Sequence, residues 1–279
     1  MTGSSLPDKI GLIAGNGDFP IVILQACRKH GIRSVVAAAK DEASEVLDQY
    51  ADRIVWMGVG QMGRMIRYFK KEGVAHAIMA GQIRHVRIFG KDHPDLRMLF
   101  LLTRLKQRNS DAILLAVADE MAREGITLID STLLLQDLVP KVGVLTRRSP
   151  NEEERKDIAF GRRIAKEIAR LDIGQTVVVR GQAVLSVEAM EGTDAAIERA
   201  SGCCFGKKTV VVKVSKPKQD LRFDVPVMGP RTIEVLKKCN VSTMAIDAGK
   251  SIILHRERVL QAADEAGIAI VAFDPDDLG

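Results

Sequence analysis

Short apolar runs alternate with amphipathic stretches along the first half of the chain. Strands are expected at residues 10–14, 34–39, 53–57 and 75–80, and helices at about 20–30 and 61–71. Apolar strands separated by helices are typical of a parallel sheet, because the crossover helices bury both faces of the strands. Helices at about 94–106 and 110–124 and a strand at 126–129 follow. The pattern predicts an N-terminal Rossmann-like α/β domain over residues 1–135.

The periodicity is lost over residues 136–156, where proline, glycine and charged residues break the pattern and a helix start follows Ser149-Pro150. Such a change of texture is typical of a linker. Periodic segments then return, which predicts a C-terminal α/β domain over residues 157–279. Its expected strands lie at 176–179, 185–187, 209–214, 241–246, 252–254 and 268–273. The helix that starts after Ser149-Pro150 is expected to end at about residue 171, and three more helices are expected at about 194–201, 230–238 and 256–266.

Composition and charge narrow the class of protein. The chain has 279 residues, of which 46% are apolar and 28% charged, and its formal net charge is +5. This is the balance of a soluble globular protein with a substantial core. The mild positive charge fits an anionic partner, either a phosphate-bearing ligand or an acidic membrane surface. It lacks the dense basic patch with interleaved aromatic residues that indicates nucleic-acid binding, so we expect no nucleic-acid partner.

The cysteines and histidines show neither zinc nor redox spacing, which indicates reduced structural thiols. The N-terminal segment MTGSSLPDK lacks the apolar centre of a signal peptide. The longest apolar run, residues 112–118, is far shorter than the roughly 20 residues of a membrane span. We therefore expect a cytoplasmic protein that meets a membrane only at its surface.

A glycine-rich loop follows the first expected strand and consists of Gly15, Asn16, Gly17, Asp18, Phe19 and Pro20. Free N–H groups at the start of the following helix favour an anion there. Pro20 stands where a dinucleotide fingerprint has its third glycine, which disfavours NAD. The loop indicates nucleotide or phosphate binding, with a tight turn that holds no ligand as the alternative. At the end of the fourth strand, Gly81 permits close backbone approach and Gln82 offers a donor and an acceptor to a base or ribose, or to local hydrogen bonds.

The two helices that follow carry consecutive apolar residues at 98–102 and 112–118. Most of these side chains are expected in the core, but they could also offer an apolar groove to an acyl chain. Asp111 suits the first turn of the second helix as an acidic residue near the positive end of the helix dipole. A role for Asp111 in substrate binding is the alternative.

An acidic turn, LSVEAMEGTD, joins a strand to a helix and carries Glu188, Glu191 and Asp194. Mg²⁺ prefers oxygen ligands, commonly one or two carboxylates together with substrate phosphate. A turn can direct carboxylates from both of its arms at one ion, so these residues are candidate metal ligands. A solvated acidic turn is the alternative interpretation.

A second informative stretch is the loop SKPKQDLRFDVPVMGPRT. Cations from Lys213 and from the loop's Lys216 and Arg222 can offset phosphate charge, while a carboxylate can hold metal or orient water. Its prolines indicate a fixed shape, although a solvated basic loop is the alternative. Gly229 and Thr232, at the start of the next helix, complete the predicted substrate-binding set. Asp247, at the end of a later strand, is an additional acid.

These motifs together resemble one family. GLIAGNGDFP, AGQI, LSVEAMEGTD, KPKQDLRFDVPVMGPRT and AIDAGK occur in order over nearly the whole chain. They are similar to the LpxI family, UDP-2,3-diacylglucosamine pyrophosphatases of lipid A biosynthesis. The resemblance implies two α/β domains with the acylated UDP-sugar lipid held between them. It also implies Mg²⁺-dependent hydrolysis at the phosphorus nearer the sugar, which gives UMP and 2,3-diacylglucosamine 1-phosphate (lipid X).

The resemblance also implies residue roles. The essential aspartate of the family matches Asp224, which we expect to be catalytic and to bind Mg²⁺ with some of the acidic-turn carboxylates. Glu188 and Lys213 complete the expected catalytic set. A peripheral contact with the inner membrane and a homodimer are both compatible with this assignment.

Two other functions remain open on the sequence alone. The first is a nicotinamide-dependent oxidoreductase built on the glycine-rich loop, which Pro20 disfavours. The second is a protein of the same fold that binds the UDP-sugar or the lipid without cleaving it. An activity assay separates this second function from a hydrolase.

Overall fold

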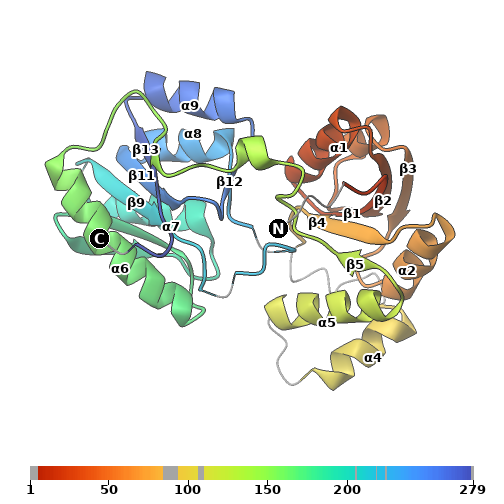
Figure 1. Cartoon of the computed structure of the whole chain (residues 1–279). Coiled ribbons are helices and arrows are strands. Elements are labelled where there is room, and N and C mark those ends of the chain that lie inside the picture. The colour runs from red at the N-terminus through yellow and green to blue at the C-terminus, as the bar shows by residue number, and fades with distance from the viewer. Residues whose placement is uncertain are drawn as a thin grey trace. The chain divides into compact units, whose positions relative to one another are not determined.

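The computed structural model in Figure 1 describes residues 6–83, 94–105, 110–204, 206–217, 219–223 and 225–277, without the side chains of Ser110 and Asp111. The described chain divides into two compact units. The N-terminal unit runs to Leu135 and includes Leu221–Phe223 from the later sequence, and the C-terminal unit comprises the other described residues.

The N-terminal unit contains the predicted parallel sheet. Its strands are β1 (Lys9–Ala14), β2 (Arg33–Ala39), β3 (Arg53–Met57), β4 (His76–Ala80) and β5 (Thr127–Leu128). They lie in the order β3-β2-β1-β4-β5 and all pair in parallel. The order reverses direction between β1 and β4, because the chain passes from β3 to the other side of β1. In open α/β sheets, a crevice for ligands forms at this point, beyond the carboxyl ends of the strands.

Helices cover both faces of this sheet. Helix α1 (Phe19–Lys29) packs on β1, β2 and β4. Helices α2 (Met62–Lys71), α4 (Leu96–Arg104) and α5 (Ser110–Arg123) share a hydrophobic core with the strands. Figure 1 shows α1 and α5 on opposite sides of the sheet. A short 3₁₀ helix, η1 (Glu45–Gln49), precedes β3.

The C-terminal unit has a mixed sheet. Its strands are β6 (Gly143–Val144), β7 (Thr176–Arg180), β8 (Ala183–Val187), β9 (Thr209–Lys213), β11 (Val241–Asp247) and β13 (Ala269–Phe273), in the order β6-β13-β11-β9-β7-β8. The three central strands β13, β11 and β9 are parallel, and each outer strand is antiparallel to its neighbour. The two units together confirm the predicted α/β class.

Two short segments form pairings that their sequence patterns did not indicate. Gly143 and Val144 fall in the predicted linker, yet they form β6 at the edge of the C-terminal sheet. The predicted strand at 252–254 forms β12 (Ile252–Ile253), which pairs with β10 (Val227–Met228) in a separate two-stranded sheet. Both strands are only two residues long, too short for a periodic pattern to reveal their partners.

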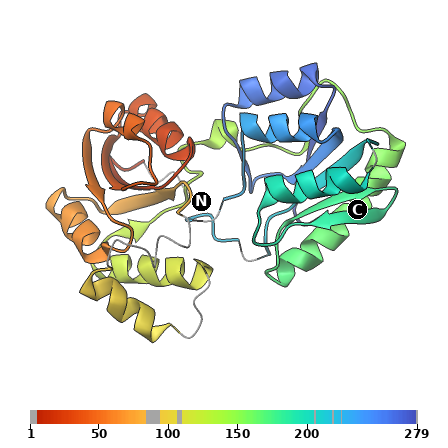
Figure 2. The ribbon, with the colours of Figure 1, turned by 180° about the vertical axis from the view of Figure 1, so that it is seen from behind.

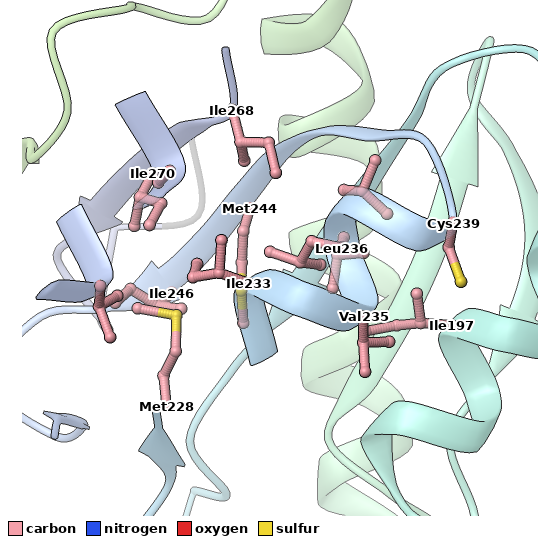
Figure 3. Close-up of a cluster of buried hydrophobic side chains, with 14 of the residues drawn as sticks. Ile197, Met228, Ile233, Val235, Leu236, Cys239, Met244, Ile246, Ile268 and Ile270 are labelled. Atoms are coloured by element: carbon pink, nitrogen blue, oxygen red, sulfur yellow. The ribbon is translucent and has the colours of Figure 1, made fainter. Parts of the chain in front are cut away.

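Alternation of side chains builds the layers of the C-terminal unit. Val177 and Val179 pack against α6 (Glu152–Arg170), whereas Val178 points to the other face. That face is covered by α7 (Thr193–Cys203), α8 (Pro230–Lys238) and α9 (Arg256–Glu265), as Figure 2 shows. In Figure 3, Ile233 and Leu236 of α8 lie against Met244 of β11. The period of two along each strand places successive residues on opposite faces.

Within the described ranges, no helix combines the length and apolar character that a membrane span requires.

Candidate functional site

The two glycine loops of the N-terminal unit meet where the strand order reverses. The amide of Gly15 donates to the carbonyl of Ala80 at 2.9 Å. Asn16 and Gln82 exchange two backbone hydrogen bonds, with N···O distances of 2.8 and 3.1 Å. The structure therefore joins the loop after β1 to the loop after β4 in one short bridge.

The bridge explains why glycine is needed in both loops. A Cβ atom on Gly15 would lie 2.5 Å from the carbonyl oxygen of Gln82, and one on Gly81 would lie 2.6 Å from the oxygen of Asn16. Gly81 also has a φ of +87°, a conformation that L side chains rarely adopt. The glycines thus make the contact between the loops possible, and the expected contact of Gly15 and Gly81 with substrate stays a prediction.

The rest of the glycine-rich loop divides into an exposed and a buried part. Asn16, Gly17 and Asp18 are exposed beyond β1, where a ligand can reach them. Phe19 and Pro20 are buried in the first turn of α1. Their side chains belong to the packing of that helix, and the expected contact of these two residues with substrate stays a prediction.

Beside the bridge lies a cavity of about 290 Å³ within the N-terminal unit. Its lining is mainly apolar and includes five methionines, namely Met57, Met62, Met65, Met79 and Met98. Gly15, Gly81 and Gln82 border it, and Val117 of α5 and Phe223 also line it. The structure therefore brings the predicted glycine loops together with both apolar runs, which supply Met98 and Val117. The side chain of Asp111 lies outside the described residues.

The carboxyl ends of the central strands form the second group of candidate residues, which we call the carboxyl edge of the C-terminal sheet. Glu188 follows β8, and Lys213 ends β9 at the same edge. The Glu188 Oε1 atom accepts a hydrogen bond from the hydroxyl of Thr193 at 2.7 Å. The Lys213 Nζ atom donates to the same hydroxyl at 3.0 Å. Thr193 therefore connects two of the three predicted catalytic residues, Glu188 and Lys213.

The other two carboxylates of the acidic turn face arginines. Glu191 accepts from Arg199 at 2.5 Å, and the Asp194 carboxylate lies 3.3 Å from the Arg231 Nε atom. Hydrogen bonds from the backbone amide of Glu191 and from Arg199 hold the pKa of the Glu191 carboxyl below its ordinary range. The three acids therefore differ in their partners: Glu191 and Asp194 each face a guanidinium group, whereas Glu188 accepts from a hydroxyl and a backbone amide.

Among the parts of the chain that the structure describes, no group of three or more His, Cys, Asp or Glu side chains is arranged to hold a metal ion. Asp224 lies outside the described residues. The described carboxylates therefore do not form a metal site by themselves, and the Mg²⁺ site around Asp224 stays a prediction.

The remaining predicted residues take separate positions. The Lys216 Nζ atom lies 2.7 Å from Asp172. Arg222 belongs to the N-terminal unit, where its guanidinium carbon is 5.6 Å from the ring centroid of Phe223. Gly229 precedes α8, and its amide donates to the hydroxyl of Thr232 at 3.3 Å.

Sequence reasoning missed several polar residues at the carboxyl edge. Thr193 stands inside the acidic turn, yet no residue pattern indicated that its hydroxyl would bridge Glu188 and Lys213. Asp247 was identified only as an acid at the end of a strand. Its partners Ser215 and Lys166 come from other elements, so their spacing in the sequence carries no signal.

Comparisons with known proteins agree over nearly the whole chain. A family model described as the LpxI N-terminal domain matches residues 9–138, and one described as the LpxI C-terminal domain matches residues 141–271. A UDP-2,3-diacylglucosamine pyrophosphatase LpxI from Caulobacter vibrioides is 32% identical over 277 residues, which cover 96% of this chain and 98% of that protein.

Among solved structures, the CobK precorrin-6A reductase matches 97% of this chain and 89% of its own, with 12% identity and a TM-score of 0.35. A biotin carboxylase domain of a thermophilic 2-oxoglutarate carboxylase has 18% identity and a TM-score of 0.28, and the match covers 62% of this chain and 35% of that chain. Similarities of this size carry no argument about function.

The loop bridge predicts a specific sensitivity to substitution. Gly81→Ala should lower the free energy of unfolding by about 2 kcal/mol or more, because it adds both a steric overlap and a strained φ. Gly125→Ala is the matched control, since Gly125 has a φ of +80° but open space around its Cβ position. Urea unfolding of the two variants measures the difference. Equal losses would show that the loops do not require the close approach.

Proposed function

The chain belongs to the LpxI family, and from this premise we propose that it hydrolyses the pyrophosphate of UDP-2,3-diacylglucosamine. Water adds across the anhydride, which releases UMP and 2,3-diacylglucosamine 1-phosphate. The observation that carries this proposal is the full-length match, at 32% identity, to a protein named for that activity.

The apolar cavity supports an acylated substrate. Its volume of about 290 Å³ lies near the lower end of the range for small-molecule sites. Methionine side chains are flexible and polarizable, so a lining with five of them can adjust to a hydrocarbon chain. Each buried CH₂ group would contribute about 0.8 kcal/mol to binding. The cavity therefore offers a place for part of one acyl chain. The exposed residues Asn16, Gly17 and Asp18, which follow the cavity residue Gly15 in the sequence, are assigned to the nucleotide.

The carboxyl edge supports phosphate chemistry. Lys213 offers a positive charge at the end of β9, and its Nζ atom is fixed by the hydroxyl of Thr193. Thr193 begins α7, whose N-terminal N–H groups favour a nearby anion. We assign Lys213 to stabilising charge on the leaving UMP and Lys216 and Arg222 to binding phosphate. Gly229 and Thr232, at the start of α8, are assigned to substrate binding.

Magnesium is part of the proposal through the family resemblance. When bound, the ion would offset the charge of the diphosphate and activate water. We propose Asp224 as its principal ligand. Glu188 is the best candidate among the acidic-turn residues, because Glu191 and Asp194 face arginines.

Release of UMP from UDP-2,3-diacylglucosamine tests the activity directly. We expect turnover with Mg²⁺, loss on addition of EDTA, and recovery when Mg²⁺ is restored in excess. Asp224→Asn should abolish UMP release, and Glu188→Gln should reduce it strongly. Glu198→Gln is the matched control, because Glu198 lies on α7 but is paired with Lys238 on the surface.

Each alternative function predicts a different result, which lipid-binding and NADH-oxidation measurements beside the UMP assay distinguish. Binding of the lipid without UMP release would indicate a carrier or sensor. Oxidation of NADH, followed by absorbance, would indicate an oxidoreductase. Full activity of Asp224→Asn would reject the assigned site while leaving the reaction in place.

The cavity assignment predicts an effect on KM. Val117→Phe places a larger side chain in the cavity, so KM for the acylated substrate should rise about tenfold while kcat changes less. Leu115→Phe is the control on the same helix, because Leu115 is exposed and does not line the cavity. Circular dichroism verifies that both variants fold. An unchanged KM in a folded Val117→Phe protein contradicts an acyl chain in this cavity.

We also propose that α4 contacts an anionic membrane surface, from which an acylated substrate must be taken. Leu96 and Phe100 are 85% and 57% exposed, and Leu99 is also exposed. Arg104 stacks on the Phe100 ring, with its guanidinium carbon 3.8 Å from the centroid. These four residues make up the α4 outer face. Helices α2 and α4, which pack together, contain six basic and no acidic residues within their spans, although Lys70 and Arg97 pair with glutamates of the α5 region.

Vesicle sedimentation tests the α4 outer face. The wild-type protein should sediment with phosphatidylglycerol-containing vesicles at low salt and less at high salt, because salt screens the charges. Leu96→Glu with Phe100→Glu should abolish sedimentation. Leu171→Glu with Ile173→Glu is the control, since both residues are exposed in the C-terminal unit. Equal binding by the two double variants would exclude the α4 outer face as the contact.

A further inference from the structure

A buried carboxylate stands where β9 and β11 stop pairing. The backbone ladder between these strands ends at the pair Ile246 and Lys213. Beyond that pair, the backbone amide and the hydroxyl of Ser215 both donate to the Asp247 Oδ2 atom, each at 2.7 Å. The side chain of Asp247 therefore continues the connection between the two strands after the ladder has ended.

Two cations from α6 approach the same carboxylate. The Lys166 Nζ atom lies 2.6 Å from the Oδ2 atom, and an Arg162 Nη2 atom lies 4.0 Å from the Oδ1 atom. Arg162 is itself held in place, because it donates to the carbonyl of Asp274 at 2.5 Å and stacks on Phe273. Asp247 is fully buried, and its Oδ1 atom makes no hydrogen bond within the described residues.

Such an arrangement contributes little to stability in general. Desolvation of buried ions is costly, and well-packed apolar residues often stabilise a fold as well as a buried ion pair does. A carboxylate with two directed hydrogen bonds to one residue does, however, fix the backbone of that residue. Ser215 is close to Lys213 in the sequence and begins the segment that contains Lys216 and leads to Leu221–Phe223.

We infer that Asp247 is a positioning residue, which sets the path of the chain at the exit from β9 and thereby holds Lys213 beside Thr193. Asp247 acts through Ser215 and does not contact substrate. The kinetic part of this inference rests on the proposed pyrophosphatase activity, whereas its structural part does not.

The same unit contains a matched control. Asp157 on α6 is also buried and accepts backbone hydrogen bonds, from Gly181 at 3.0 Å and from Gln182 at 2.6 Å. These residues form the turn between β7 and β8, which lies at the opposite edge of the sheet from Lys213. Asp157 therefore fixes a loop by the same kind of bond without a connection to the carboxyl edge.

Asp247→Asn tests the inference in the full-length protein. The amide retains the size of the carboxylate but leaves Lys166 and Arg162 without an anion. We expect kcat for UMP release to fall about tenfold or more, with KM within about threefold of wild type. Asp157→Asn should lower the thermal midpoint but leave kcat within about twofold of wild type.

A second variant separates the effect of Asp247 on the position of Lys213 from its effect on the stability of the fold. Adding Lys166→Met to Asp247→Asn removes the nearer of the two cations left without an anion, so the thermal midpoint should recover in part while kcat stays low. Recovery of kcat together with stability would overturn the inference, and so would a folded Asp247→Asn protein with wild-type kcat.

Amide hydrogen exchange supplies a readout that does not depend on activity. Exchange at residues 214–216 should rise in Asp247→Asn and stay unchanged in Asp157→Asn, where only residues 181 and 182 should exchange faster. Unchanged exchange at residues 214–216 in Asp247→Asn overturns the inference. If the wild-type protein releases no UMP, the proposed function fails, and the exchange result alone decides the role of Asp247.

Discussion

Parallel pairing of strands is the constraint on which both candidate sites depend. Parallel neighbours end at the same edge of a sheet, so residues far apart in the sequence meet wherever the chain leaves its strands. In the N-terminal unit this places Asn16 beside Gln82, and in the C-terminal unit it places Ser215 beside Asp247. The N-terminal sheet is entirely parallel and the C-terminal sheet has antiparallel outer strands, but the candidate residues of each lie at the carboxyl ends of its strands.

Much of this framework could be predicted from the sequence, because strand and helix periods are local properties. The apolar runs and glycine turns indicated the parallel sheet and the loops that follow β1 and β4, whereas the bridge between those loops was found only in the structure. The reason for glycine could not be predicted in the same way. Whether Gly15 makes room for a ligand or for the carbonyl of Gln82 depends on a contact between distant segments. The same limit explains why β6 was not predicted. Its two residues are too few to show a strand pattern, and only their pairing with β13 identifies them as a strand.

The acidic turn shows why the partners of charged side chains could not be predicted from the sequence. The spacing of Glu188, Glu191 and Asp194 is compatible with a metal site and with a solvated turn. What distinguishes the three is the position of Arg199 on α7 and Arg231 on α8, which only the folded chain defines. The apolar run on α4 is similar. Its helical period places Met98 inward and Phe100 outward, but whether inward residues pack tightly or leave a cavity depends on the volumes of their neighbours.

The two candidate sites use opposite physical means, and under the proposed function each would bind one part of an amphipathic substrate. Methionines around the N-terminal cavity can change rotamer at small cost, which is what a flexible hydrocarbon chain requires. The carboxyl edge instead fixes its charges through directed hydrogen bonds, from Lys213 to Thr193 and from Ser215 to Asp247. Charge stabilisation during phosphoryl chemistry depends on groups that need no reorganisation, so small displacements matter there. A deformable apolar lining and a rigid polar edge are therefore the two properties that a hydrolase of an acylated nucleotide sugar must combine.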